Sequence, residues 1–412
     1  MELLVKNIKK LVQVENVSRR WVAGSDMANL PSIDNAYLLI KGNLIADFGP
    51  MSECPEIKTG MEVVDASGRM VFPSFCDSHT HLIYAGSREI EYVDKIRGLS
   101  YEEIAKRGGG ILNSAQRLRE TSEEELFESA MDRINEIISL GTGAVEIKSG
   151  YGLNTEAEMK MLRVAHRIKK ASPITVKTTF LGAHAVPLEY RGRQSEYVDL
   201  IVNEMIPMVA AEQLADYVDV FCDKGFFTVE ETDKMLNAAA KFGIRPKIHA
   251  NELALSGGIQ VGIKHNALSV DHLEFTEADE IRELLNSTTM PTLLPGAAFF
   301  LGMNYPPARK MIDSGLPVAV ASDYNPGSSP SGDMRFILSL SCIKMKMLPE
   351  EAINAATLNS AYAMGVNETL GSIARGKVAN FYITKQIPNY EFIPYAYTQR
   401  FVEKAFLNGK PI

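Results

Sequence analysis

Two histidines separated by one residue, His79 and His81, form the pair in this chain with the clearest chemical use. In an extended strand alternate side chains share a face, so both imidazoles would project to one side while Thr80 points away. Two neutral imidazoles at a strand end make half of a metal site. The alternative is a pair of exposed or hydrogen-bonded histidines, because the His-x-His pattern is short.

The positions of the other histidines favour a metal site. His166 and His265 lie in expected helical or connecting sequence, where a surface or packing role is the ordinary one. The remaining five of the seven histidines lie at or near the ends of expected strands: His79, His81, His184, His249 and His272.

One carboxylate has a similar position. The apolar segment 318–323 stops at Asp323, and a buried strand that leads to a lone carboxylate requires a partner for its charge. A cation held by His79, His81, His249 and Asp323 would be that partner. Nitrogen and oxygen donors without sulfur suit zinc or iron rather than magnesium or calcium, so we predict one transition metal per chain.

The middle of the chain has the alternation of strands and helices that would position these residues. Helix starts are indicated where Ser or Thr precedes Glu by three residues, at Ser100, Thr121, Thr155 and Thr228. Eight strands alternating with helices predict a (β/α)8 barrel of α/β class, with an open doubly wound sheet as the alternative. No G-x-G-x-x-G follows a strand, which argues against a dinucleotide fold. The expected strands are 75–81, 143–148, 174–184, 217–223, 247–252, 268–274, 290–294 and 318–323.

Both ends of the chain contain shorter strands. Segments 36–40 and 44–47 flank Gly42-Asn43, and 62–65 and 70–72 flank Ser67-Gly68, which predicts two hairpins. Matching strands are expected near the C-terminus, at 378–384 and 405–407. We therefore predict a small β-sandwich domain built from both termini, with domain limits at 1–70, 71–366 for the barrel, and 367–412.

Composition favours a soluble enzyme. The formal net charge of −8, with both signs interspersed, argues against a nucleic-acid partner. No apolar run reaches the length of a membrane span and no signal-peptide core opens the chain, so we expect no membrane partner and a cytoplasmic location. The four cysteines form no C-x-x-C and are expected to be reduced.

The arrangement of His-x-His on the first strand, histidines on the fifth and sixth strands and Asp on the eighth resembles the amidohydrolase superfamily of metal-dependent hydrolases and deaminases. Within it, the flanking motifs resemble, end to end, the group that opens an imidazolone ring in histidine degradation. These motifs lie at 75–82, 85–89, 107–111, 146–153, 249–252 and 322–328.

The resemblance implies hydrolysis of the ring amide of 4-imidazolone-5-propanoate to N-formimidoyl-L-glutamate. We also expect the protein to form a homodimer. A metal generates hydroxide near neutral pH, and Asp323 can take a proton from the attacking water. Glu252 can pass a proton to the ring nitrogen, and His272 can polarise the carbonyl. The alternative roles are a helix-start carboxylate for Glu252 and a hydrogen-bonded supporting group for His272.

The family pattern also implies the substrate contacts. Arg88 is expected to bind the propanoate, because guanidinium matches a carboxylate with two prongs. The other expected contacts are Tyr151, His184, Glu252, Asn325, Gly327 and Ser328.

Two alternative functions stay open. A deaminase or other cyclic amide or amidine hydrolase would keep the metal ligands but would not need Arg88 with Tyr151. A non-catalytic relative would be expected to have lost ligands, whereas every position here is filled.

Some superfamily members bridge two metals with a lysine late in the fourth strand. Lys148 ends the second strand instead, so we expect one metal and an ion pair of Lys148 with Glu146 or Asp77.

Overall fold

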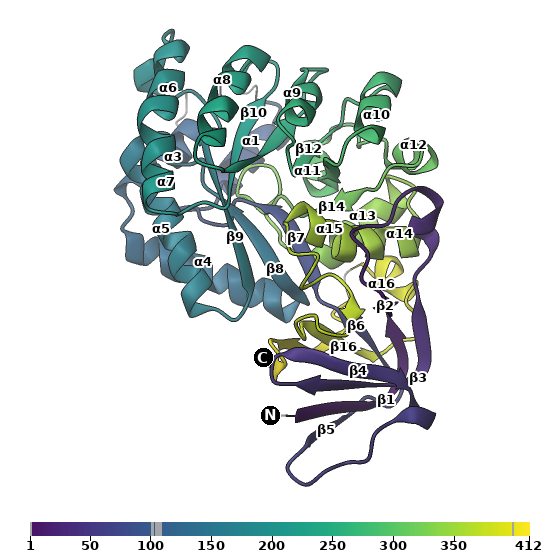
Figure 1. Ribbon diagram of the computed structural model, residues 1–412. Coiled ribbons are helices and arrows are strands. Elements are labelled where there is room, and N and C mark those ends of the chain that lie inside the picture. Colours follow the sequence, from purple (N-terminus) through teal and green to yellow (C-terminus); the bar gives the residue numbers. More distant parts are fainter. Residues whose placement is uncertain (1, 100–102, 104–108, 398) are drawn as a thin grey trace.

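The protein consists of a barrel and a smaller sheet beside it (Figure 1). The structure, a computed structural model, describes residues 2–99, 103, 109–397 and 399–412. Ser100, predicted to begin a helix, and Arg107 and Gly108 of the 107–111 motif lie outside the described residues.

Eight parallel strands form the barrel, each hydrogen-bonded to the next in chain order. The first and last strands also meet, since the Asp323 N–H donates to the His79 carbonyl at 3.0 Å and the His81 N–H to the Tyr324 carbonyl at 2.9 Å. The barrel prediction is therefore confirmed over the open sheet. The strands are β7 (Phe75–Thr80), β8 (Thr142–Lys148), β9 (Thr175–Ala183), β10 (Tyr217–Cys222), β11 (Arg245–Ala250), β12 (Ser269–His272), β13 (Met290–Leu293) and β14 (Ala319–Val320).

Amphipathic helices surround the barrel, because one apolar stripe of each can cover the strands while the opposite face stays in water. In α4, for instance, Ala130, Ile134 and Ile137 are buried. The helices are α1 (Glu89–Ile96), α3 (Ile111–Glu120), α4 (Glu123–Ser139), α5 (Thr155–Ala171), α6 (Gln194–Leu200), α7 (Ile206–Ala211), α8 (Val229–Ala240), α9 (Gly258–Lys264), α10 (Ala278–Leu285), α11 (Pro295–Leu301), α12 (Ala308–Asp313), α13 (Met334–Ile343), α14 (Pro349–Asn354), α15 (Ser360–Ala363) and α16 (Phe392–Tyr395).

The predicted helix starts have mixed outcomes. Thr228 caps α8 as expected, but α4 is capped by Ser122 with Glu125, one residue later than predicted, because Thr-Ser-Glu-Glu-Glu offers two overlapping pairs. α5 begins at Thr155 as predicted, but its cap is Asn154, whose side chain accepts from the Ala157 N–H, and not Thr155 with Glu158.

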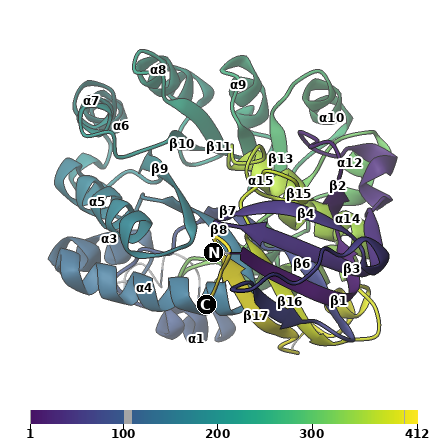
Figure 2. The ribbon, with the colours of Figure 1, turned by 60° about the horizontal axis from the view of Figure 1, so that its bottom comes forward.

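Strands from both ends of the chain form the smaller sheet, in the order β18-β17-β16-β6-β1-β3-β4, with β5 also paired to β1 (Figure 2). Its construction from both termini is as predicted; the domain limits remain a proposal, and the first falls within β6. The strands are β1 (Glu2–Val12), β3 (Ser32–Lys41), β4 (Leu44–Pro50), β5 (Glu62–Asp65), β6 (Arg69–Pro73), β16 (Phe381–Gln386), β17 (Val402–Leu407) and β18 (Lys410–Pro411); β2 (Val14–Glu15) pairs separately with β15 (Ile373–Ala374).

One of the two predicted hairpins forms. β3 and β4 pair antiparallel across Gly42-Asn43, whereas β5 and β6 both run parallel to β1 instead of pairing with each other. The buried β6 gains a ladder on each side, with β1 and β16, which a hairpin with the exposed β5 would not allow.

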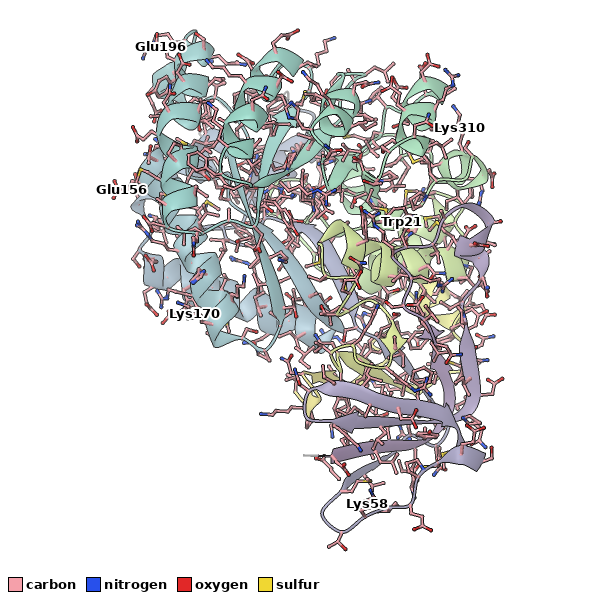
Figure 3. The ribbon with its side chains drawn as sticks, viewed as in Figure 1. Trp21, Lys58, Glu156, Lys170, Glu196 and Lys310 are labelled. Carbon is pink, nitrogen blue, oxygen red and sulfur yellow. The ribbon has the colours of Figure 1, made fainter. Side chains whose placement is uncertain are left out.

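Many charged side chains lie on the outer surface of the protein. Lys58, Glu156, Lys170, Glu196 and Lys310 are all exposed at the periphery (Figure 3). Among the described residues no helix combines the length and the apolar character that crossing a membrane requires.

Candidate active site

A cavity of about 430 Å³ opens where the barrel strands end. In a (β/α)8 barrel this end carries the chemistry, because the loops after the strands converge there. Every site residue predicted from the sequence lines this cavity except His79, which is completely buried. The structure therefore brings together residues from six of the eight barrel strands and the loops that follow them.

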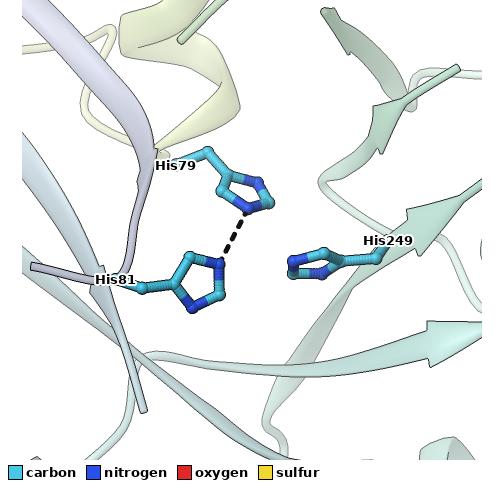
Figure 4. A group of neighbouring side chains, drawn as sticks. All are labelled: His79, His81 and His249. Carbon is cyan, nitrogen blue, oxygen red and sulfur yellow. Dashed lines mark hydrogen bonds between the residues drawn. The ribbon is translucent and has the colours of Figure 1, made fainter. Parts of the chain in front are cut away.

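Three histidines cluster at this cavity, two of which, His81 and His249, line it (Figure 4). His79 and His81 project to the same side from β7 and its end, and His249 approaches from β11; one nitrogen of each lies within 4.8 Å of the others. The Nε2 atoms of His79 and His81 are 3.3 Å apart, and Asp323 Oδ1 lies 3.6 Å from both. Donors about 2.1 Å from a tetrahedral ion are separated by about 3.4 Å, so this spacing fits a metal.

The protonation states also fit a metal. Burial, reinforced by neighbouring positive charge, lowers the pKa of the His79 and His81 imidazoles well below the usual value, which keeps them neutral. Burial raises the pKa of Asp323 to about 6. Neutral imidazoles with one carboxylate are a donor set that zinc and iron accept.

Glu252 and His272 lie side by side beyond the histidines, with His272 Nε2 3.6 Å from the Glu252 carboxylate. The Asp223 carboxylate accepts hydrogen bonds from the N–H groups of Glu252 and Leu253, at 2.7 and 3.0 Å, and so orients the Glu252 segment. Burial disfavours the His272 cation, but Glu252 and Glu274 outweigh it and raise the pKa of His272 to about 10. The pair can therefore hold and move a proton.

The backbone is strained at this end of the barrel. His272, Leu273 and Asp323 have φ values of 85°, 70° and 53°, in the left-handed region that non-glycine residues rarely adopt. Such strain concentrates at functional sites, where the surrounding structure holds side chains in required directions.

Arg88 also lines the cavity, and Glu91 orients its guanidinium. Arg88 Nε and Nη2 donate to Glu91 Oε2 at 2.9 and 2.5 Å, which leaves Nη1 facing Gly327. A Cβ atom at position 327 would lie 2.3 Å from Nη1, so a larger residue there would displace the end of the guanidinium.

The loop after β14 is organised by the amide of Asn325. Its Oδ1 accepts hydrogen bonds from the N–H groups of Gly327 and Ser328, both at 2.8 Å, and its Nδ2 donates to the Ser328 hydroxyl at 2.7 Å. The Ser328 hydroxyl in turn donates to Asp323 Oδ2 at 3.2 Å. Asn325 therefore shapes the loop that borders Asp323.

Tyr151 and His184 complete the cavity wall, and Glu158 holds the loop that carries Tyr151. Glu158 is fully buried, and its carboxylate accepts from the N–H groups of Gly150, Gly152 and Leu153 at 3.0, 2.7 and 2.8 Å. The Gly150 carbonyl contacts His184 Nδ1 at 3.0 Å. Glu158 therefore does not cap a helix. It fixes the backbone of residues 150–153, which carries Tyr151 and contacts His184.

Residues 70–412 match the Amidohydrolase family. The chain belongs to this family. Over 412 residues it is 55% identical to the imidazolonepropionase of Flavobacterium johnsoniae and 54% identical to that of Christiangramia forsetii, with 100% of both chains covered in each comparison. It is therefore a hydrolase of the imidazolonepropionase group within the amidohydrolases. The solved structure of E. coli guanine deaminase is similar with a TM-score of 0.76 and 14% identity, over 100% of this chain and 99% of that one, a likeness of fold alone.

Several residues in and around this cavity were not predicted from the sequence. Lys95, Phe221 and Phe226 line it, and the two phenylalanine rings stack with centroids 4.0 Å apart. Asp219 and Asp271 lie behind the histidines, 2.9 Å from His249 Nδ1 and 2.6 Å from His79 Nδ1. A carboxylate on an otherwise apolar buried strand, the signal used for Asp323, would have identified both.

Lys148 forms an ion pair, as predicted, with Glu146 at 2.6 Å. The alternative partner, Asp77, is wrong: its carboxylate accepts from the N–H and hydroxyl of Ser322, at 2.9 and 2.5 Å. Asp77 therefore ties β7 to the end of β14 instead of meeting the lysine.

Glu158→Gln should reduce kcat/KM about tenfold or more while leaving the metal content unchanged. The substitution replaces one acceptor oxygen with an NH2 group that faces a backbone N–H, and a buried hydrogen bond to a charged group contributes about 1.5 to 3 kcal/mol. Steady-state kinetics and metal analysis of the purified protein measure both quantities. Glu156→Gln, an exposed change in the same helix, is the control; equal kinetics for the two variants would refute the role of Glu158.

Proposed function

We propose that the cavity hydrolyses the ring amide of 4-imidazolone-5-propanoate to N-formimidoyl-L-glutamate. The observation that carries this proposal is the presence, in one cavity, of a three-histidine cluster with a carboxylate and of a guanidinium whose Nη1 faces Gly327. The first group suits a hydrolytic metal and the second suits the substrate carboxylate.

We assign the metal to His79, His81, His249 and Asp323, as one zinc or iron ion per chain. When bound, such a metal acidifies water toward neutral pH and polarises a carbonyl. A single ion agrees with the position of Lys148, whose ammonium is held by Glu146 and Asp219 and is not free to bridge two ions.

The chain's own residues then move the protons. Asp323 accepts a proton from water as its oxygen adds to the ring carbonyl carbon. His272 donates a hydrogen bond to the carbonyl oxygen, on which negative charge develops. Glu252 delivers a proton to the ring nitrogen as the C–N bond breaks. The nitrogen leaves as part of a neutral amidine, and the carbonyl carbon becomes that of a carboxylate.

We assign the substrate's propanoate to Arg88 and its ring to Tyr151, His184 and Glu252. Asn325, Gly327 and Ser328 form the loop that borders the same space. We also propose a homodimer and a cytoplasmic location; sedimentation velocity of the purified protein tests the first.

Arg88→Met should cost about 2 to 5 kcal/mol in kcat/KM for the natural acid, because truncation leaves a buried carboxylate without its partner. Most of this loss should vanish with an imidazolone that lacks the carboxylate. Measuring both proteins on both substrates closes a double-mutant cycle and isolates the pairwise energy from general damage.

The control for this cycle is Arg97→Met, which alters an exposed arginine just after the same helix. If Arg88→Met slows both substrates equally, Arg88 does not bind the propanoate. A deaminase or another hydrolase of uncharged rings would then be the better assignment.

A further inference from the structure

We propose that Lys148 is a positioning residue that couples two of the metal-binding histidines, His79 and His249, through the carboxylates of Asp271 and Asp219. The proposal rests on the metal assignment above. Lys148 touches neither histidine, and it lies fully buried inside the barrel at the end of β8.

The contacts converge on two oxygen atoms. Asp219 Oδ2 lies 2.8 Å from Lys148 Nζ and 2.9 Å from His249 Nδ1. Asp271 Oδ2 lies 3.7 Å from Lys148 Nζ and 2.6 Å from His79 Nδ1. One ammonium thus faces the same two carboxylate oxygens that lie next to the Nδ1 atoms of both rings.

These groups form a charged layer beneath the histidines. Alternate residues of a barrel strand point inward, so Lys247 lies below His249 on β11 as Glu146 lies below Lys148 on β8. Lys247 bonds Glu146 and the Ser78 carbonyl and lies 3.9 Å from Asp271 Oδ2. Glu146, Asp219 and Asp271 bring three negative charges and the two lysines two positive charges, all fully or almost fully excluded from water.

The layer has a direct consequence for the rings. An imidazole whose Nδ1–H donates to a carboxylate presents the lone pair of Nε2 on its other side, which is the form that binds a metal. Without Lys148, Asp219 and Asp271 would be neighbouring buried anions, and their carboxylates would repel each other and turn apart. This movement would release the rings of His79 and His249 together.

The test measures metal affinity, not turnover. Zn²⁺ is titrated in competition with a chromophoric chelator into the full-length parent protein and into Lys148→Met, Asp271→Asn and the double variant. Loss of such an outer hydrogen-bond partner typically weakens metal binding 10- to 100-fold. We expect an increase of that size in the Zn²⁺ dissociation constant for each single variant, and no further increase in the double variant.

Lys377→Met is the matched control. Lys377 is another buried lysine, but it lies in the segment before β16 and bonds the Leu370 carbonyl and the Ser372 hydroxyl. It should lower the melting temperature without changing the Zn²⁺ dissociation constant. Lys148→Arg, which keeps the cation, should restore part of the affinity lost in Lys148→Met.

The outcomes separate this inference from the proposed function. A parent protein that binds no Zn²⁺ would overturn the metal assignment itself. Parental affinity in Lys148→Met, or multiplying effects in the double variant, would overturn only the coupling. If circular dichroism shows that Lys148→Met does not fold, the same cycle is measured with Asp219→Asn, Asp271→Asn and their double variant. Increases in the Zn²⁺ dissociation constant that multiply would overturn the coupling. Increases that do not multiply would support it.

Discussion

His249→Ala should yield a folded protein that contains little metal and has no measurable hydrolase activity. His249 is the only one of the three clustered histidines that comes from β11, so its removal leaves two imidazoles on one strand and a carboxylate. A set with one donor missing binds the metal far more weakly. Metal analysis, circular dichroism and loss of imidazolone absorbance measure the three properties.

His265→Ala is the control for this variant. His265 follows α9, pairs with Asp233 at 2.8 Å and lies outside the cavity. It should keep both metal and activity. A His249→Ala protein with full metal and full rate would remove His249 from the ligand set.

Glu252→Gln should retain the metal while kcat falls by a factor of roughly 10² to 10⁴, the usual contribution of a positioned acid or base. The amide keeps the volume of the side chain and its hydrogen-bonding capacity but cannot deliver the proton that the ring nitrogen needs. Burial raises the pKa of the Glu252 carboxyl, which favours its protonated form more than in an exposed glutamate.

Two comparisons sharpen this prediction. Glu252→Asp keeps the acid but retracts it, so its kcat should lie between those of the parent and Glu252→Gln. Metal content of all three proteins separates proton transfer from ligation. Unchanged turnover in Glu252→Gln would exclude Glu252 from proton transfer, and a loss of metal in parallel with rate would make it a ligand instead.

Much of the site could be anticipated because its signals are local. The single-residue spacing places His79 and His81 on one face of a strand, and an apolar segment that stops at Asp323 marks a strand end. The ion pair of Arg88 with Glu91 is equally local, since the two residues lie three positions apart at the start of α1, and this spacing alone would have predicted it.

Pairing between distant segments was less accessible. The interpretation of 62–65 and 70–72 as a hairpin was reasonable from Ser67-Gly68, but strand partners depend on what else lies beside each strand. Only the fold shows that β6 lies between β1 and β16. Glu158 was likewise given a helix-capping role from its spacing to Thr155, although its carboxylate reaches three backbone N–H groups of the preceding loop.

By itself the sequence determined the alternation of strands and helices, the strand ends that carry histidines, and the kinds of side chain available to a metal and a carboxylate substrate. These features depend on residue type and on spacing within one element, where backbone geometry alone directs the side chains. The tertiary structure decided which side chains from different strands contact each other. Lys148 meets Asp219 across 71 positions of sequence, and Asp271 meets His79 across 192, because closing the barrel brings inward residues of different strands into one layer.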